Sequence, residues 1–418
     1  MPSGQPETGG AVRVPGGPPT SPTPRRVLEA LLGIPFTEGN RIDVLKDGNE
    51  TFPALLAAIT AARRTIDLLW FSWRGGEISH EVAGALAAQA RDGVRVRILL
   101  DGYGAKHMDR DDLRRLRTAG CTVYFYRPMH GPRITAWNMR SHRRVLVCDD
   151  VVGFTGGAGI DRVWTGDGRH PGNWRDTSYR VEGPAVAGLR SAFVAAWMQA
   201  QVRLPEGLVP EDDRFPELPA VGTTAVQVLR TASQPGWSEA AIAIAALLRT
   251  AREEVRITTP YIRLPRWLRQ LVGDTARRGV RVRVLVCGPH VERPSVHLQG
   301  ELDFQPLLDD GVEIWRYQPS LVHAKIVSVD GATAMVGTAN FDIRSLALNE
   351  QVCLLLDDPA VVAVLDGHFA EDLAESERVD PERWRARSVR RRTLEVAADV
   401  VGRPLRGLGA AGLAGRRP

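Results

Sequence analysis

The chain has 418 residues, of which 44% are hydrophobic, which is enough for two domains with apolar cores or for one large duplicated domain. Its net charge of +5 is a mild bias toward anionic partners and does not separate lipid from nucleic acid. The 4 cysteines include no Cys-x-x-Cys pair, so neither a zinc site nor a disulfide framework is indicated, and a cytoplasmic protein is favoured.

The N-terminal segment differs in composition from the rest of the chain. Residues 1–24 are rich in Gly, Pro, Ser and Thr and lack the apolar core of a signal peptide. We therefore expect a disordered leader over 1–38. No apolar run farther along the chain reaches the roughly 18 to 20 residues that span a bilayer.

Helical and extended patterns alternate after this leader. Apolar residues recur at every third and fourth position in 79–90, 110–118 and 267–277, and short apolar strands lie between such stretches. This alternation predicts α/β modules with mixed, largely parallel sheets that are covered by helices on both faces. The expected divisions are a first module at 39–203, a Pro-containing acidic linker at 204–221, a second module at 222–372 and an Arg-rich tail at 373–418.

The two halves of the chain repeat each other. Four blocks match in the same order, and the second shares five identical residues in succession. The pairs are 62–68 with 251–257, 93–99 with 279–285, 120–128 with 311–319, and 142–162 with 323–344. One such match would carry little weight, but four in order indicate an internal duplication.

The fourth block contains the residues that suit catalysis. His323 and Lys325 are two apart on an expected strand, so they point to the same face, where the ammonium can neutralise phosphoryl oxygens beside the imidazole. The first half repeats the spacing at His142 and Arg144. Two histidines brought to one centre suit a double displacement, in which one attacks phosphorus and the other transfers protons.

This pattern resembles the phospholipase D superfamily, which carries two His-x-Lys-x4-Asp motifs. The sequence 323–330 matches the motif, and 337–350 after it is similar to bacterial cardiolipin synthases in particular, as are 174–177 and 182–184 after the first histidine. The resemblance covers roughly 38–372. It implies two tandem α/β modules related by a pseudo-two-fold axis and a reaction without metal or other cofactor.

The resemblance also implies residue roles. His142 and His323 would be the nucleophile and the general acid/base, with His142 provisionally the nucleophile. Lys325 would hold the phosphate, and the remaining motif residues would line the site or brace the fold. The expected phosphate-binding residues are Thr338, Asn340 and Gly157, and the expected structural residues are Asp149, Asp330 and Glu350.

The first half departs from the family pattern at two positions. Arg144 replaces the motif lysine, which keeps the charge but adds bulk, and the exchange is either drift in a lysine-poor chain or a sign that lysine matters more at Lys325. Gly159 stands where the second half has Asn340, so one side-chain donor is missing. We expect an active enzyme; the alternative is a first half that binds phosphate without turnover.

The Arg-rich tail is a candidate membrane contact. Six arginines between 383 and 392 surround Trp384, and apolar residues follow. Such a cluster attracts anionic headgroups, so we expect a cytoplasmic protein with peripheral contact at the inner face of the membrane. A solvated tail without lipid contact is the alternative.

The expected substrate is a phosphatidylglycerol-like phospholipid, whose phosphatidyl unit passes to an alcohol or to water. A phospholipase D-type hydrolase is therefore an alternative to a synthase. A nuclease and a non-catalytic binder of anionic lipid are further alternatives. No nucleic-acid partner is expected, because the chain carries both copies of the motif and lacks a regular pattern of aromatic and basic residues.

Overall fold

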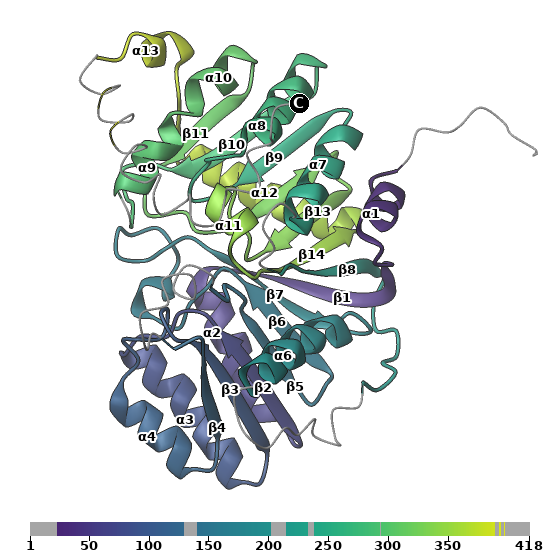
Figure 1. The fold of residues 1–418 in the computed structure, drawn as a ribbon, viewed down its shortest axis with the longest axis vertical. Helices are drawn as coiled ribbons and strands as arrows, with labels where there is room; N and C mark the ends of the chain where they lie inside the picture. The colour runs from purple at the N-terminus through teal and green to yellow at the C-terminus, as the bar shows by residue number, and fades with distance from the viewer. Residues whose placement is uncertain are drawn as a thin grey trace, which may run out of the picture.

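A computed structural model describes residues 23–128, 140–201, 215–232, 238–292, 294–388, 393 and 397. In this part of the chain the strands form one 15-stranded sheet in the order β15-β11-β10-β9-β12-β13-β14-β8-β1-β7-β6-β5-β2-β3-β4. Helices pack on both faces of the sheet (Figure 1).

The first half of the chain builds one side of this sheet. Its elements are α1 (Pro24–Leu32), β1 (Thr37–Lys46), α2 (Asp47–Ala61), β2 (Thr65–Trp70), α3 (Glu77–Arg91), β3 (Arg95–Asp101), α4 (Arg110–Thr118), β4 (Thr122–Tyr126), β5 (Val145–Cys148), β6 (Val152–Gly156), the 3-10 turn η1 (Arg162–Trp164), β7 (Thr177–Glu182) and α6 (Val186–Gln201).

The second half builds the other side. Its elements are β8 (Thr224–Arg230), α7 (Glu239–Thr250), β9 (Glu254–Thr258), α8 (Arg266–Arg277), β10 (Arg281–Cys287), α9 (Pro294–Glu301), α10 (Phe304–Asp309), β11 (Glu313–Tyr317), β12 (Ile326–Val329), β13 (Thr333–Gly337), α11 (Ile343–Ala347), β14 (Val352–Asp357), α12 (Pro359–Ala374), β15 (Ser376–Arg378) and α13 (Pro381–Arg385).

The strand order confirms two modules related by a pseudo-two-fold axis. Strands β1 and β8 are antiparallel neighbours at the centre, and the order outward from them is the same on both sides until β15 is added at one edge. The expectation of largely parallel sheets is wrong. Among the strands of the described residues, only β2-β3-β4 and β9-β10-β11 pair in parallel. Short turns such as 149–151 connect strands without a crossover helix, and this requires antiparallel pairing.

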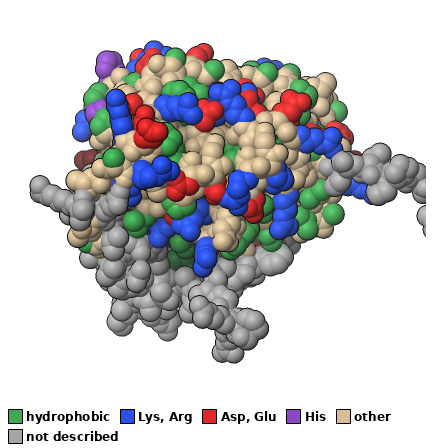
Figure 2. All heavy atoms as spheres, turned by 90° about the horizontal axis from the view of Figure 1, so that it is seen from above, with side chains coloured by type: hydrophobic (Ala, Val, Ile, Leu, Met, Phe, Trp, Pro, Cys, Tyr) green, Lys and Arg blue, Asp and Glu red, His purple; other side chains and the backbone are tan. Residues whose placement is uncertain are grey.

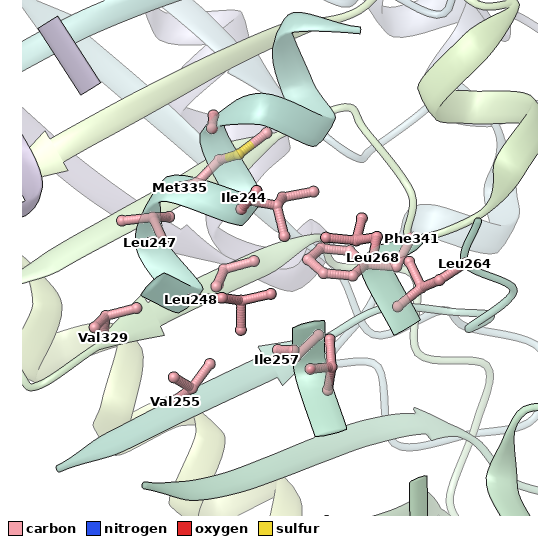
Figure 3. Close-up of a cluster of buried hydrophobic side chains, with 14 of the residues drawn as sticks. Ile244, Leu247, Leu248, Val255, Ile257, Leu264, Leu268, Val329, Met335 and Phe341 are labelled. Atoms are coloured by element: carbon pink, nitrogen blue, oxygen red, sulfur yellow. The ribbon is translucent and has the colours of Figure 1, made fainter. Parts of the chain in front are cut away.

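Three large apolar clusters hold the sheet and its helices together. One lies within the first half and one mainly within the second half, which Leu28 and Phe36 also join. Figure 3 shows this second-half cluster, where Ile244 and Leu248 of α7 pack near Val255 and Ile257 of β9. The third cluster combines α6 and α12 with strands of both halves. Because this cluster buries side chains from both modules, the halves form one packed body.

The N-terminal boundary differs from the expected one. Residues 24–32 are not part of a disordered leader, because they form α1, whose Leu28 is fully buried against the second-half cluster. The side chain of Thr23 accepts a hydrogen bond from the backbone of Arg26 and so caps the helix. Strand β1 then begins at Thr37. Residues 1–22 lie outside the described part.

The C-terminal boundary is also later than expected. Strand β15 pairs with β11, and the Trp384 ring lies 5.2 Å from the ring of Phe304, so the second module continues past residue 372. Arg385 pairs with Asp309, and Arg387 lies over the Trp384 ring. Trp384 therefore belongs to the folded module, and its contact with a membrane stays a prediction. Arg390, Arg391 and Arg392 lie outside the described residues.

The surface at this end of the molecule is mixed in charge. Figure 2 shows Lys and Arg side chains interspersed with Asp and Glu over this face. None of the helices in the described ranges is long and apolar enough to cross a membrane.

Candidate active site

The two motif histidines lie in extended segments that cross between the modules. The sequence predicted that these histidines lie on strands. They instead precede β5 and β12. The backbone N–H of His142 donates to the carbonyl of Glu350 at 2.9 Å, and that of His323 donates to the carbonyl of Arg175 at 2.6 Å. Each histidine is therefore fixed by a hydrogen bond to the other half of the chain.

Acceptors surround Nδ1 of His142. This atom lies 3.0 Å from the carbonyl oxygen of Thr338 and 3.1 Å from Oε1 of Gln351. The orientation of the Gln351 amide is fixed, because its Nε2 donates to the carbonyl of Ser345 and its Oε1 accepts from Thr338. Nδ1 of His142 must therefore carry the hydrogen, which leaves Nε2 with a free lone pair.

The charge environment keeps His142 neutral. Burial and the nearby positive charges of Arg144 and Lys325 hold its pKa well below the usual range. A neutral imidazole with a free Nε2 is the form required of a nucleophile.

His323 has a different partner. Its Nδ1 lies 2.7 Å from Oδ2 of Asp176 and also 2.7 Å from Nζ of Lys325. One nitrogen cannot donate to the carboxylate and accept from the ammonium at the same time, so the two contacts correspond to two positions of one proton. Burial and Lys325 lower the pKa of His323 to about 4, although Asp176 opposes this shift. Its environment thus offers both a donor and an acceptor for proton transfer.

Lys325 and Arg144 supply buried positive charge beside the histidines. Burial lowers the pKa of Lys325 to about 7, against the opposing effect of Asp176. Arg144 is 1% exposed, its Nη1 donates to the carbonyl of His142 at 3.2 Å, and burial lowers its pKa to about 10. The ring of Phe71 lies beneath its guanidinium. Arginine is thus accommodated at the position of the motif lysine.

Two buried polar atoms in the site lack hydrogen-bond partners within the described residues. They are Nε of Arg144 and Oδ1 of Asn340. Buried polar groups are normally satisfied, so these atoms are suited to contact a bound substrate or water. Nε of Arg144 carries a hydrogen and can donate to a phosphoryl oxygen, whereas Oδ1 of Asn340 only accepts and suits a hydroxyl group or a water.

Two other expected phosphate ligands have different contacts. Thr338 is fully buried, its hydroxyl donates to Gln351 at 2.7 Å, and its carbonyl accepts from His142, so it orients the histidine. A Cβ on Gly157 would lie 2.2 Å from Oδ1 of Asp176. Glycine is needed there to make room for the carboxylate, and its contact with a phosphate stays a prediction.

The motif aspartates lie at the far ends of β5 and β12 from the histidines. The carboxylate of Asp149 accepts from the backbone N–H groups of 63, 64 and 65, and that of Asp330 accepts from those of 252, 253 and 254. Both residues adopt positive φ angles, 54° and 51°, in the turns that follow their strands. These are contacts of structural residues, which supports the role expected from the resemblance.

Glu350 holds the halves together through buried contacts. Its Oε1 accepts from the hydroxyl of Tyr126 at 2.9 Å and from Arg127 at 2.8 Å, and Arg143 lies 3.8 Å from its other oxygen. All three partners come from the first module. This arrangement supports the expected structural role.

Asp176 and Gln351 are functional candidates that we did not select from the sequence. Each immediately precedes the corresponding strand of its module, β7 or β14, and each faces the histidine of the other module. The matched blocks end before both positions, at 162 and 344, which is why the repeat did not pair them. The segment 174–177 contains Asp176, but no sequence signal links it to His323.

The comparison with family models decides the classification. The model described as "Cardiolipin synthase, PLD-like domain" matches residues 55–165 and 244–373, which are more than half of the chain and contain both histidines. The chain belongs to this family. The resemblance predicted from the motifs is therefore confirmed.

Individual relatives agree with this family. The chain is 30% identical to the probable cardiolipin synthase YwiE of Bacillus subtilis over 358 residues, which are 85% of this chain and 70% of the relative. It is 29% identical to the major cardiolipin synthase ClsA of the same organism over 84% of this chain and 72% of that protein.

The phosphatidylserine synthase structure from Haemophilus influenzae aligns with a TM-score of 0.66 and 16% identity, covering 91% of this chain and 98% of that one. This similarity confirms the fold of this chain.

Proposed function

We propose that this protein transfers the phosphatidyl unit of one phosphatidylglycerol-like lipid to the hydroxyl of another, through a covalent intermediate on His142. Membership of the cardiolipin synthase family supports phosphatidyl transfer as the reaction class. The observation that carries the proposal is the difference between the two histidines. An amide and a carbonyl orient His142, whereas a carboxylate and an ammonium flank His323.

In the first step Nε2 of His142 attacks phosphorus, and the bond from phosphorus to the headgroup oxygen breaks. The leaving glycerol oxygen takes a proton from His323, so the products are glycerol and phosphatidyl-His142. Lys325 and Arg144 offset the negative charge on the phosphoryl oxygens as the bonds change.

In the second step the hydroxyl of the acceptor lipid gives its proton to His323 and its oxygen attacks phosphorus. The bond between phosphorus and Nε2 of His142 breaks, which restores the neutral imidazole. If water takes the place of the lipid hydroxyl, the product is phosphatidic acid, and the enzyme is a hydrolase.

The test uses purified protein with vesicles of phosphatidylglycerol. Equal molar yields of cardiolipin and glycerol support the proposal. Phosphatidic acid in place of cardiolipin would identify a hydrolase, and vesicle binding without a product would identify a lipid-binding protein. The His142→Ala and His323→Ala variants serve as controls, and full activity in both would exclude the shared site.

Contact with a membrane follows from this proposal, because the substrate lies in a bilayer. We propose peripheral attachment at the cytoplasmic face, favoured by anionic headgroups and the net charge of +5. Flotation with vesicles that contain phosphatidylglycerol, compared with vesicles of phosphatidylcholine alone, tests the dependence on charge. Equal flotation with both would contradict it.

A further inference from the structure

The backbone of Gly159 lies directly against the Trp164 ring in the first half of the site. Gly159 is the counterpart of Asn340, each lying three residues after the glycine that ends its strand, Gly156 or Gly337. A Cβ on Gly159 would lie 2.6 Å from Cζ3 of Trp164 and 2.9 Å from its Cη2. The indole therefore fills the volume into which a side chain at 159 would extend.

The indole of Trp164 also reaches the acid–base histidine. Its Nε1 donates to Oδ2 of Asp176 at 2.9 Å, and this same oxygen faces Nδ1 of His323 at 2.7 Å. The Trp164 and His323 rings meet edge to face, with centroids 5.4 Å apart and planes at 72°. The other carboxylate oxygen accepts from the backbone of Thr177. Both oxygens of Asp176 thus have fixed donors.

The two halves use the same arrangement with different side chains. In the second half, the hydroxyl of Thr338 donates to Gln351, which orients His142. In the first half, the indole of Trp164 donates to Asp176, which orients His323. Each orienting residue therefore accepts from one side-chain donor of its own module.

We propose that Trp164 is a positioning residue for His323, and that Gly159 is glycine because the indole needs its volume. This inference rests on the proposed function, in which His323 transfers protons. The N–H bond holds Oδ2 of Asp176 in place against Nδ1 of His323, which leaves Nε2 of this histidine to exchange a proton with the substrate oxygen. The edge-to-face contact limits rotation of the imidazole. Together these contacts keep His323 able to donate to the leaving oxygen.

The decisive variant is Trp164→Phe, which keeps an aromatic ring and removes the N–H donor. Its matched control is Trp174→Phe, because the Trp174 ring lies at the same centroid distance of 5.4 Å from His323. With phosphatidylglycerol, Trp164→Phe should lower kcat about tenfold, the scale of one lost charge-assisted hydrogen bond, with KM changed less than about twofold. The control should change kcat less than about threefold.

A second substrate separates proton donation from general damage. A p-nitrophenyl phosphodiester has a leaving group that needs no proton, so its first-turnover release should be nearly the same in Trp164→Phe and in the natural protein. An equal loss on both substrates would overturn the proposal and indicate a merely structural tryptophan.

A readout without turnover keeps the test independent of the proposed function. NMR of histidine-labelled protein follows the titration of His323, identified by the loss of its signal in His323→Gln. The pKa of His323 should change in Trp164→Phe and stay the same in Trp174→Phe. An unchanged pKa of His323 in Trp164→Phe would contradict the positioning role. A changed pKa in a protein that makes no lipid product would contradict only the proposed function. If Trp164→Phe does not fold, benzothienylalanine at 164 removes the same N–H in an isosteric ring.

Discussion

Nδ1 of His142 lies 3.1 Å from Oε1 of Gln351, a residue of the other module whose amide cannot carry a charge. His323 faces the carboxylate of Asp176, which has the position in the first module that Gln351 has in the second. The pseudo-symmetric site therefore gives its two histidines different electrostatic partners. A neutral partner favours a neutral nucleophile, and a charged partner favours a group that gains and loses a proton.

The Gln351→Glu variant tests this difference directly. The side chain keeps its shape, but the new carboxylate favours the protonated form of His142, so the pKa of this histidine should rise. Since protonation removes the nucleophile, the acidic limb of the profile of kcat/KM against pH should move upward by about one unit, with about fivefold lower activity at the original midpoint. The neighbouring variant Glu350→Gln should leave this limb in place. Coincident profiles for Gln351→Glu and the natural protein would contradict the role of the amide.

Trapping the intermediate tests the assignment of the nucleophile. In His323→Ala the second step lacks its base, so a short exposure to phosphatidylglycerol should leave a phosphatidyl adduct on His142, detectable by mass spectrometry of peptides at neutral or alkaline pH. The first step also slows, by about 100-fold or more, because the leaving oxygen receives no proton. An adduct on His323 in His142→Ala would reverse the assignment.

The charge of Lys325 should make substrate binding depend on pH. Because burial lowers its pKa to about 7, Lys325 loses its proton at a lower pH than an exposed lysine does. Binding of an anionic phosphodiester favours the protonated form, so affinity should weaken as the pH rises through this region. Calorimetric titration of the His142→Ala variant with short-chain phosphatidylglycerol measures this, since the diester charge is constant from pH 6 to about 9. Lys325→Arg should remove the dependence, because arginine stays charged.

Exchange of Arg144 tests whether arginine impairs the first motif. The guanidinium is buried, bonds to the carbonyl of His142 and lies over Phe71. We expect Arg144→Lys to reduce kcat/KM about tenfold. Lysine lacks the guanidinium group, so the hydrogen bond to the carbonyl of His142 and the packing over the Phe71 ring are lost. Arg144→Met removes the charge and should cost about 100-fold or more. A rate above that of the natural protein in Arg144→Lys would instead show that arginine limits this half.

The motif aspartates should affect stability more than chemistry. Asp330→Ala removes the acceptor of three backbone N–H groups and places alanine at a φ of 51°, so the free energy of unfolding should fall by about 2 to 4 kcal/mol. Asp330→Asn keeps an acceptor and tolerates the angle, so it should lose about half as much. Thermal denaturation measures both. Full stability with lost activity would place Asp330 in the chemistry.

The sequence by itself determined the duplication, the two-module α/β fold and the pair His142 and His323 with Lys325. These features are local: repeated blocks, hydrophobic periodicity and a short motif are all visible along the chain. The resemblance carried by the same motif also predicted a structural role for Asp149 and Asp330, although not the backbone groups that they contact.

The tertiary structure alone decided which side chains meet across the modules. Asp176 faces a histidine 147 positions away, and Gln351 faces one 209 positions away, so neither pairing leaves a trace in the local sequence. Burial then sets the charge of each group, as for Lys325, and burial depends on how the whole sheet packs. The difference between the two histidines therefore arises from contacts between the modules.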